Sequence, residues 1–152
     1  MNVRYDMVMC YVVRGTGTSW EFLQMKRARG RYLGGTWQTV AGRIEAGETA
    51  WQAALRELKE ETGLEAEELY CLDRVNSFYV HGDDTLWHAP VFCAIVDSRE
   101  PVRINEEHEE WRWIRREEAE GSFLWPSDRE GIKQVCAEIL NNGAAKGYMR
   151  VK

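Results

Sequence analysis

Three glutamates, Glu57, Glu60 and Glu61, are spaced three and four residues apart in a segment rich in helix-forming residues. At 100° per residue these spacings put all three carboxylates on one face of a helix. Like charges at such spacings destabilise an isolated helix by roughly a few tenths of a kcal/mol per pair, so we expect a cation among them. Hard divalent cations select oxygen ligands, and the natural candidate is Mg²⁺, with Mn²⁺ as the alternative.

Arg56 precedes the first of these glutamates and lies on the flank of the same predicted helix. Its guanidinium could hold Glu48, Glu57 or Glu60 in position by a two-pronged contact. The competing interpretation is a plain solvated face, in which charges of both signs pair along the helix and do no chemistry.

The helix that must carry these groups is predicted over residues 49–62. Thr49 and Gln52 fit a capping box at its start, and Gly63 is well placed to end it. The periodicity predicts an apolar stripe against the core, formed by Trp51, Leu55, Leu58 and Thr62. It also predicts an open face one turn before the glutamates, formed by Ala50, Ala53 and Ala54.

The rest of the chain reads as strands with one further helix. Residues 3–13 and 20–25 predict a hairpin that turns at Gly15 and Gly17, and a basic loop, 26–35, leads to a short strand at 37–40. Further strands are predicted at 69–80, 90–96 and 111–114. A second helix over 131–140 is started by Pro126, Ser127 and Asp128. Without a regular βαβ period, this order favours a mixed sheet flanked by helices.

Length and charge narrow the classes of function. At 152 residues the chain suits one domain, and a net charge of −5 argues against bulk nucleic-acid or anionic-membrane binding. No stretch reaches the roughly 18 apolar residues of a membrane span, and no signal core follows the N-terminus. We therefore expect a cytoplasmic protein that meets a small phosphate-bearing partner at a local site.

The whole segment GRIEAGETAWQAALRELKEETGL resembles the Nudix box, G-x5-E-x7-R-E-U-x-E-E-x-G-U, in which U is aliphatic. Every specified position matches: Gly42, Glu48, Arg56, Glu57, Leu58, Glu60, Glu61, Gly63 and Leu64. The resemblance implies a single Nudix hydrolase domain over residues 1–152, with an α/β/α sandwich and a mixed β-sheet. It also implies metal-dependent hydrolysis of a phosphoanhydride bond in a nucleoside diphosphate linked to another group.

The resemblance also implies roles for single residues. Glu57, Glu60 and Glu61 match the metal-binding glutamates of the family, Arg56 matches its orienting arginine, and Ala41 would offer its backbone carbonyl to the metal. Which glutamate acts as the general base stays open.

Many relatives add a glutamate from outside the box. The candidates here are Glu106, Glu107, Glu109 and Glu110. We select Glu107, as metal ligand and catalytic group, because E-H-x-x-x-x-W before a short strand resembles the segment in which relatives place it. A solvated charged loop is the alternative, and His108 is expected to be a neighbour and not a ligand.

The substrate is less sharply indicated. WQTVAGRIEAGET, EHEEWRW and WPSDRE resemble segments of the bacterial dATP and dihydroneopterin triphosphate pyrophosphatase branch, which implies a nucleotide triphosphate split into monophosphate and pyrophosphate. Arg27 would then hold phosphate, and Trp37 or Trp125 would stack on a base. Dinucleoside polyphosphates, nucleotide sugars and a non-catalytic nucleotide-binding regulator remain alternatives.

Overall fold

The computed structural model describes residues 1–16 and 18–152 and contains one eight-stranded mixed sheet. Its path runs β1-β7-β2-β3-β4, with β5 added to β2, β6 to β7 and β8 to β3. β7 is parallel to β1 and β2, and the other pairs are antiparallel. The strands are β1 (Asn2–Arg4), β2 (Met7–Gly15), β3 (Trp20–Arg27), β4 (Trp37–Gln38), β5 (Val40–Arg43), β6 (Glu68–Val80), β7 (Thr85–Ile95) and β8 (His108–Arg115).

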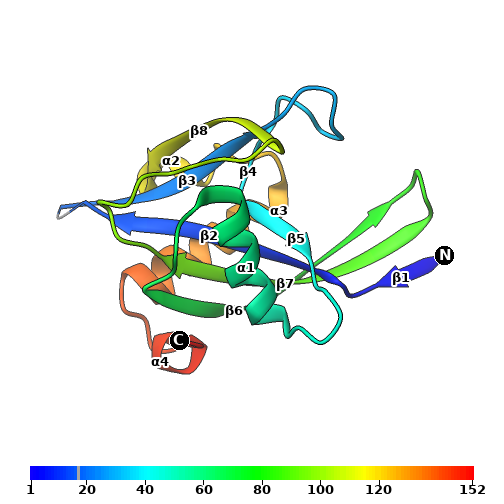
Figure 1. Ribbon diagram of the computed structural model, residues 1–152. Coiled ribbons are helices and arrows are strands. Elements are labelled where there is room, and N and C mark those ends of the chain that lie inside the picture. The colour runs from blue at the N-terminus through cyan, green and yellow to red at the C-terminus, as the bar shows by residue number, and fades with distance from the viewer. Residues whose placement is uncertain (17) are drawn as a thin grey trace.

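Helices cover both faces of this sheet (Figure 1). They are α1 (Ala50–Thr62), α2 (Arg116–Ala119), α3 (Pro126–Gln134), its π-helical continuation η1 (Val135–Leu140) and α4 (Lys146–Met149). Alternate residues of β2 point to opposite faces, so Cys10 packs with α1 and Tyr11 packs with α3 and η1. The expected α/β/α sandwich with a mixed sheet is confirmed.

The predicted hairpin is formed by β2 and β3, although Gly17, one of its two expected turn residues, lies outside the described residues.

β7 begins at Thr85, five residues before the predicted start at 90. Pro90 misled that prediction, because proline is uncommon inside a sheet. It is accommodated here between the segment of β7 that pairs with β1 and the segment that pairs with β2.

α1 begins and ends as predicted. The Thr49 hydroxyl accepts from the Gln52 backbone N–H at 3.2 Å, the Gln52 side chain accepts from Thr49 N–H at 2.9 Å, and Gly63 closes the helix at φ 74°. The prediction of its buried face is right for Leu58 and Thr62, which are fully buried, but wrong for Trp51, which is 39% exposed. Ala53 and Ala54, expected on an open face, are also fully buried. The small alanines, and not the tryptophan, allow the helix to lie close to the sheet.

The second helix runs from Pro126 through η1. It ends at Leu140 as predicted but begins five residues before the predicted start at 131, at the proline that was expected to signal that start. Asp128, in its first turn, is buried and accepts a hydrogen bond of 2.6 Å from the Tyr11 hydroxyl of β2. This bond fixes the start of α3 against the centre of the sheet.

Within the part of the chain that the structure describes, no helix is long and apolar enough to span a membrane.

Candidate metal site and its surroundings

The centre of the candidate site is the side of α1 that faces β5. Glu61 is 2% exposed at its side chain, and Glu57, one helical turn earlier, is 12% exposed. Gly42 in β5 packs directly against Glu57, and a Cβ at this position would lie 2.6 Å from Glu57 Cγ. The glycine of the motif is therefore explained by the close approach of the helix to this strand.

Burial dominates the electrostatics of Glu61. It raises the pKa of this carboxyl well above the usual value, and the adjoining Glu57 carboxyl and the charge of Glu107 raise it further. Arg27 acts in the opposite direction and lowers the pKa of Glu61. A buried carboxylate surrounded by others is stable as an anion only when a cation offsets the repulsion.

A loop and β8 bring Glu107 and His108 to the same place. Ligand atoms of Glu61, Glu107 and His108 all lie within 4.8 Å of one another. His108 Nε2 is 3.9 Å from Glu61 Oε1, and burial, followed by the charges of Arg27 and Arg31, lowers the pKa of His108 to about 4. The imidazole is therefore neutral at pH 7 and has a lone pair to offer.

Two buried atoms of this group lack a hydrogen-bond partner among the described residues, Glu61 Oε2 and His108 Nδ1. Buried polar atoms are nearly always partnered, so an orphaned carboxylate oxygen beside a second carboxylate fits a divalent cation. The residues present thus suit a divalent metal ion.

Arg56 organises the flank of the cluster. Its guanidinium donates to both Glu48 oxygens, at 2.8 and 3.0 Å, to Glu57 Oε1 at 2.8 Å and to the Arg43 carbonyl at 2.7 Å. The hydrogen bond between Arg56 and Glu48 is the main reason why the pKa of Arg56 is raised and the pKa of Glu48 is lowered. One side chain therefore ties the loop after β5 to Glu57.

Glu60 and Ala41 occupy the margins of the cluster. The Glu60 side chain is 54% exposed and contacts Arg56 at 3.2 Å, so the structure does not bring it into the group formed by Glu61 and Glu107. Ala41 lies in β5, pairs with Met9 and immediately precedes Gly42. Its backbone therefore passes next to the strand position that touches Glu57.

Glu109 and Glu110 lie in β8 and contact different partners. Glu109 lies 3.7 Å from Lys26 and 3.9 Å from Arg29, and Glu110 lies 3.1 Å from Lys26. Among the four candidates, Glu107 is the one grouped with Glu61. His108 was expected to be only a neighbour, yet the structure includes it in that group, and its adjacency to Glu107 was the one available signal.

The three predicted substrate contacts are spread around the site. Arg27 lies 3.8 Å from Glu107 and so borders the cluster. Trp37 is half-buried under Arg112, whose guanidinium carbon lies 3.8 Å from the ring centroid. Trp125 is 46% exposed and stands at the start of α3. Only Arg27 reaches the carboxylates directly.

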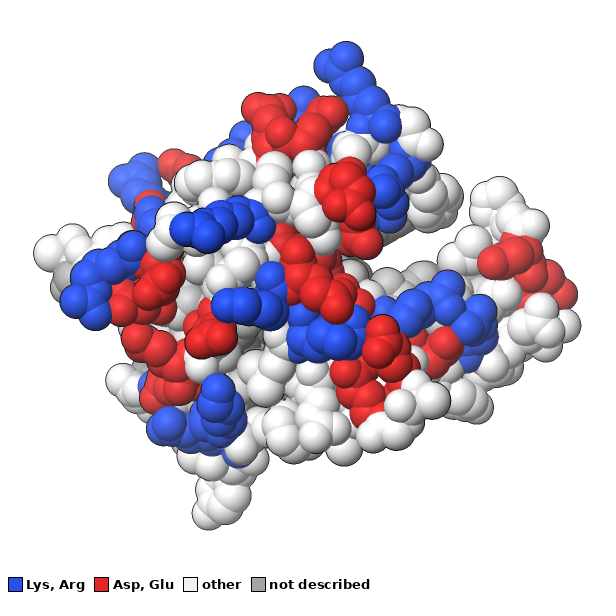
Figure 2. Space-filling view, viewed as in Figure 1, with Lys and Arg blue, Asp and Glu red and all other residues white. Residues whose placement is uncertain are grey.

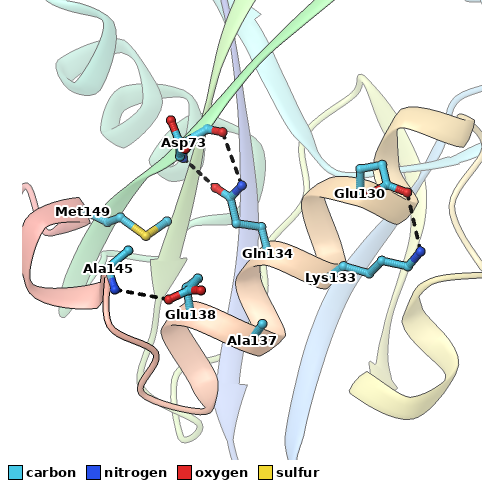
Figure 3. Close-up of a pocket in the computed structure, with 8 residues that line it drawn as sticks. All are labelled: Asp73, Glu130, Lys133, Gln134, Ala137, Glu138, Ala145 and Met149. Carbon is cyan, nitrogen blue, oxygen red and sulfur yellow. Dashed lines mark hydrogen bonds and ion pairs between the residues drawn. The ribbon is translucent and has the colours of Figure 1, made fainter.

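A hollow of about 370 Å³ elsewhere in the fold does not belong to this site (Figure 3). It lies between α3, η1, α4 and β6, and most of its polar side chains already pair with neighbours. Lys133 contacts Glu130 at 3.5 Å, and Glu138 accepts from Ala145 N–H at 3.2 Å. On the face that carries α1, by contrast, acidic and basic side chains gather side by side (Figure 2).

Comparisons with known proteins bear on this geometry. The model of the NUDIX domain matches residues 4–135. A Mycobacterium tuberculosis protein that carries the provisional name 8-oxo-dGTP diphosphatase 2 is 33% identical over 129 residues, which cover 84% of this chain and 87% of that protein. A Myxococcus xanthus protein named octanoyltransferase is 36% identical over 129 residues, 83% of this chain, but the match spans only 35% of its length.

A solved structure supports the fold in the same way. The Caenorhabditis elegans Ap4A hydrolase, in a binary complex, superposes with a TM-score of 0.76 at 21% identity, covering 93% of this chain and 99% of that one. At this identity the likeness concerns the fold alone. The match over residues 4–135 and the complete motif on α1 lead to one conclusion: the chain belongs to the NUDIX domain family, that of the Nudix hydrolases.

Proposed function

We propose that this protein hydrolyses a phosphoanhydride bond of a nucleotide in a reaction that depends on a divalent metal ion. The observation that carries the proposal is the buried Glu61, which has one oxygen without a partner among the described residues and is grouped with Glu107 and His108. A purely structural helix would gain nothing from a carboxylate buried beside other carboxylates, because such a group costs free energy unless it is compensated. Membership in the NUDIX domain family supports the same activity.

Mg²⁺ is the proposed ion, with Mn²⁺ as the alternative, and its proposed ligands are Glu57, Glu60, Glu61, Glu107 and the carbonyl of Ala41. When bound, such an ion neutralises phosphate charge and lowers the pKa of a coordinated water. The geometry favours Glu61 and Glu107, which lie in one group, and Glu57, whose carboxyl adjoins that of Glu61. Glu60 is less favoured because its side chain is 54% exposed and lies outside that group. His108 offers a neutral nitrogen beside them.

The surroundings of each side chain suggest its role in the reaction. Glu57 and Glu107 are the candidates that accept the proton of the attacking water, since both carboxylates reach the site and are partly open to solvent. Arg56 is a positioning residue in this scheme. It holds Glu57 through one nitrogen and the Arg43 carbonyl through another.

For the substrate we propose a nucleoside triphosphate or deoxynucleoside triphosphate, or the related dihydroneopterin triphosphate, released as monophosphate and pyrophosphate. Arg27 supports this choice, because a guanidinium next to the carboxylates is suited to a phosphate that extends beyond them. Trp125, exposed at the start of α3, offers a ring face for a base, and Trp37 offers one only if Arg112 moves aside. We further propose that residues 1–152 form one Nudix domain that acts on a small nucleotide in the cytoplasm.

The test is a panel of nucleoside triphosphates, dinucleoside polyphosphates and nucleotide sugars, incubated with Mg²⁺ and with products separated by ion-exchange chromatography. Monophosphate and pyrophosphate from a triphosphate are the expected products. Glu57→Gln is the matched control, because it keeps the shape of the side chain, and we expect it to lower kcat by at least about a hundredfold.

Two other outcomes would contradict the proposal in different ways. Cleavage confined to dinucleoside polyphosphates or nucleotide sugars would keep the chemistry and replace the substrate. Nucleotide binding without release of any product would identify a regulator that keeps the fold and not the reaction.

A further inference from the structure

Asn105, in the loop that precedes β8, uses both ends of its side-chain amide. Its Nδ2 donates to the backbone carbonyl of Glu60 in α1 at 3.1 Å. Its Oδ1 accepts from the backbone N–H of Glu107 at 3.0 Å. A single amide can donate and accept at once, whereas a carboxylate only accepts, so this double contact selects asparagine over aspartate.

The two partners belong to the two segments that carry the carboxylates. Glu60 stands between Glu57 and Glu61 on α1, and Glu107 comes from a loop far along the chain. The Glu107 backbone is also held at its carbonyl, which accepts a hydrogen bond from the Ala28 N–H at 2.9 Å. The position of the Glu107 backbone is thus set by Asn105 on one side and by the end of β3 on the other.

We propose that Asn105 is a positioning residue that holds Glu107 at ligand distance from Glu61. The inference rests on the proposed metal-dependent function and deepens it. The Glu107 and Glu61 carboxylates repel each other when both are ionised and no cation lies between them, so the loop needs a restraint that does not depend on the ion. The Asn105 amide supplies one by linking the loop to the helix backbone.

The consequence is preorganisation of the metal site. Mg²⁺ tolerates little deviation from its preferred geometry, so a loop free to move would have to be ordered at the moment of binding. Removing groups that orient ligands typically weakens metal binding about 10- to 100-fold. We therefore expect Asn105→Ala to raise the Kd for Mn²⁺ about 10-fold or more, with kcat recovering at high Mn²⁺ concentration.

The experiment measures Mn²⁺ binding directly, by the electron paramagnetic resonance signal of the free ion during titration of the whole chain. Asn105→Ser keeps a short acceptor for the Glu107 N–H but cannot reach Glu60, so we expect an intermediate Kd. Arg103→Ala is the matched control, because its side chain is exposed in the same loop and its link to α1 is a backbone bond from its own N–H to the Thr62 carbonyl. Its Kd should equal that of the wild-type protein.

A double variant separates positioning from general damage to the fold. If Asn105 acts through Glu107, then Asn105→Ala adds no further loss of Mn²⁺ affinity in a Glu107→Gln background. Loss by the same factor in both backgrounds, or an unchanged Kd in Asn105→Ala alone, would overturn the inference while leaving the metal-dependent function standing. A wild-type chain that binds no Mn²⁺ would overturn both.

Discussion

Replacing Gly42 by alanine is the most direct probe of the close approach between β5 and α1. The new Cβ would lie 2.6 Å from Glu57 Cγ, and closer still to the Glu57 carboxyl group, whereas ordinary contacts begin at 3.4 Å. Glu57 must therefore retreat by at least about 0.8 Å, the difference between these two distances. The backbone of Gly42 is outside the left-handed region, so alanine itself adds no strain there.

This displacement of Glu57 should lower kcat strongly and the free energy of unfolding only slightly. A displacement of about 1 Å in a catalytic group can lower the rate about a hundredfold, and we expect a loss in kcat of that size. Overpacking at a side chain that can still swing toward solvent should cost about 1 kcal/mol, near the lower end of the usual range. For a chain of this length that corresponds to a Tm lower by about 3 °C.

The assay compares kcat for a nucleoside triphosphate at saturating Mg²⁺ with the Tm of the same samples. Gly82→Ala is the control, because nothing lies within 4 Å of the Cβ it would gain and its φ is also outside the left-handed region. Combining Gly42→Ala with Glu57→Gln should give the kcat of Glu57→Gln alone. An unchanged kcat in Gly42→Ala would refute the idea that the position of Glu57 limits the reaction.

Three further predictions concern other parts of the site and its support. Glu107→Gln should reduce kcat far more than Glu109→Gln, since Glu109 faces Lys26; equal small losses in steady-state assays would refute the assignment. Because the pKa of Glu61 is raised in the folded protein, the folded state holds this proton more tightly than the unfolded chain does. The stability that this proton contributes is lost as pH rises above the pKa of glutamate in the unfolded chain. In chelator, the Tm of Glu61→Gln relative to that of the wild-type protein should therefore increase as pH rises above 4.5, the ordinary pKa of glutamate, and a pH-independent difference in melting curves would contradict this. Tyr11→Phe removes the donor to Oδ1 of buried Asp128, whose Oδ2 still accepts from the Trp125 N–H, and should cost about 1–3 kcal/mol in urea unfolding; a smaller change would mean that the bond contributes little.

The sequence predicts the ends of the site's helix well but only part of the face that it buries. Thr49, Gln52 and Gly63 act through bonds within a few residues of each other, so local chemistry was sufficient to place both ends of α1. Which arc of the helix meets the sheet depends on the shape of the partner surface. The sheet lies so close that alanines fit under the helix, and Trp51 is left at the surface.

For the candidate site, too, the sequence predicted the features that lie within one helix and missed those that depend on contacts between distant segments. The motif gave the spacing of Glu57 and Glu61 and the place of Arg56, because all three lie on one helix. The spacing allowed the contact between Arg56 and Glu60, but periodicity could not reveal that Glu60 is mostly in solvent or that His108 joins the buried group. The place of His108 depends on how β8 pairs with β3, with Arg27 opposite His108, which is a contact between distant parts of the chain.

The parallel pairing of β2 with β7 has a consequence for how the chain folds during synthesis. Met9 pairs with Val91, so a strand near the N-terminus stays without one neighbour until most of the chain has been made. Contacts this far apart in sequence slow folding, because the loop between them must close first. The β2–β3 hairpin and α1 can form early from local contacts, while the edge of β2 that awaits β7 stays open to pairing with other chains. Nascent chains that stall before β7 emerges should therefore be the form of this protein most prone to aggregation.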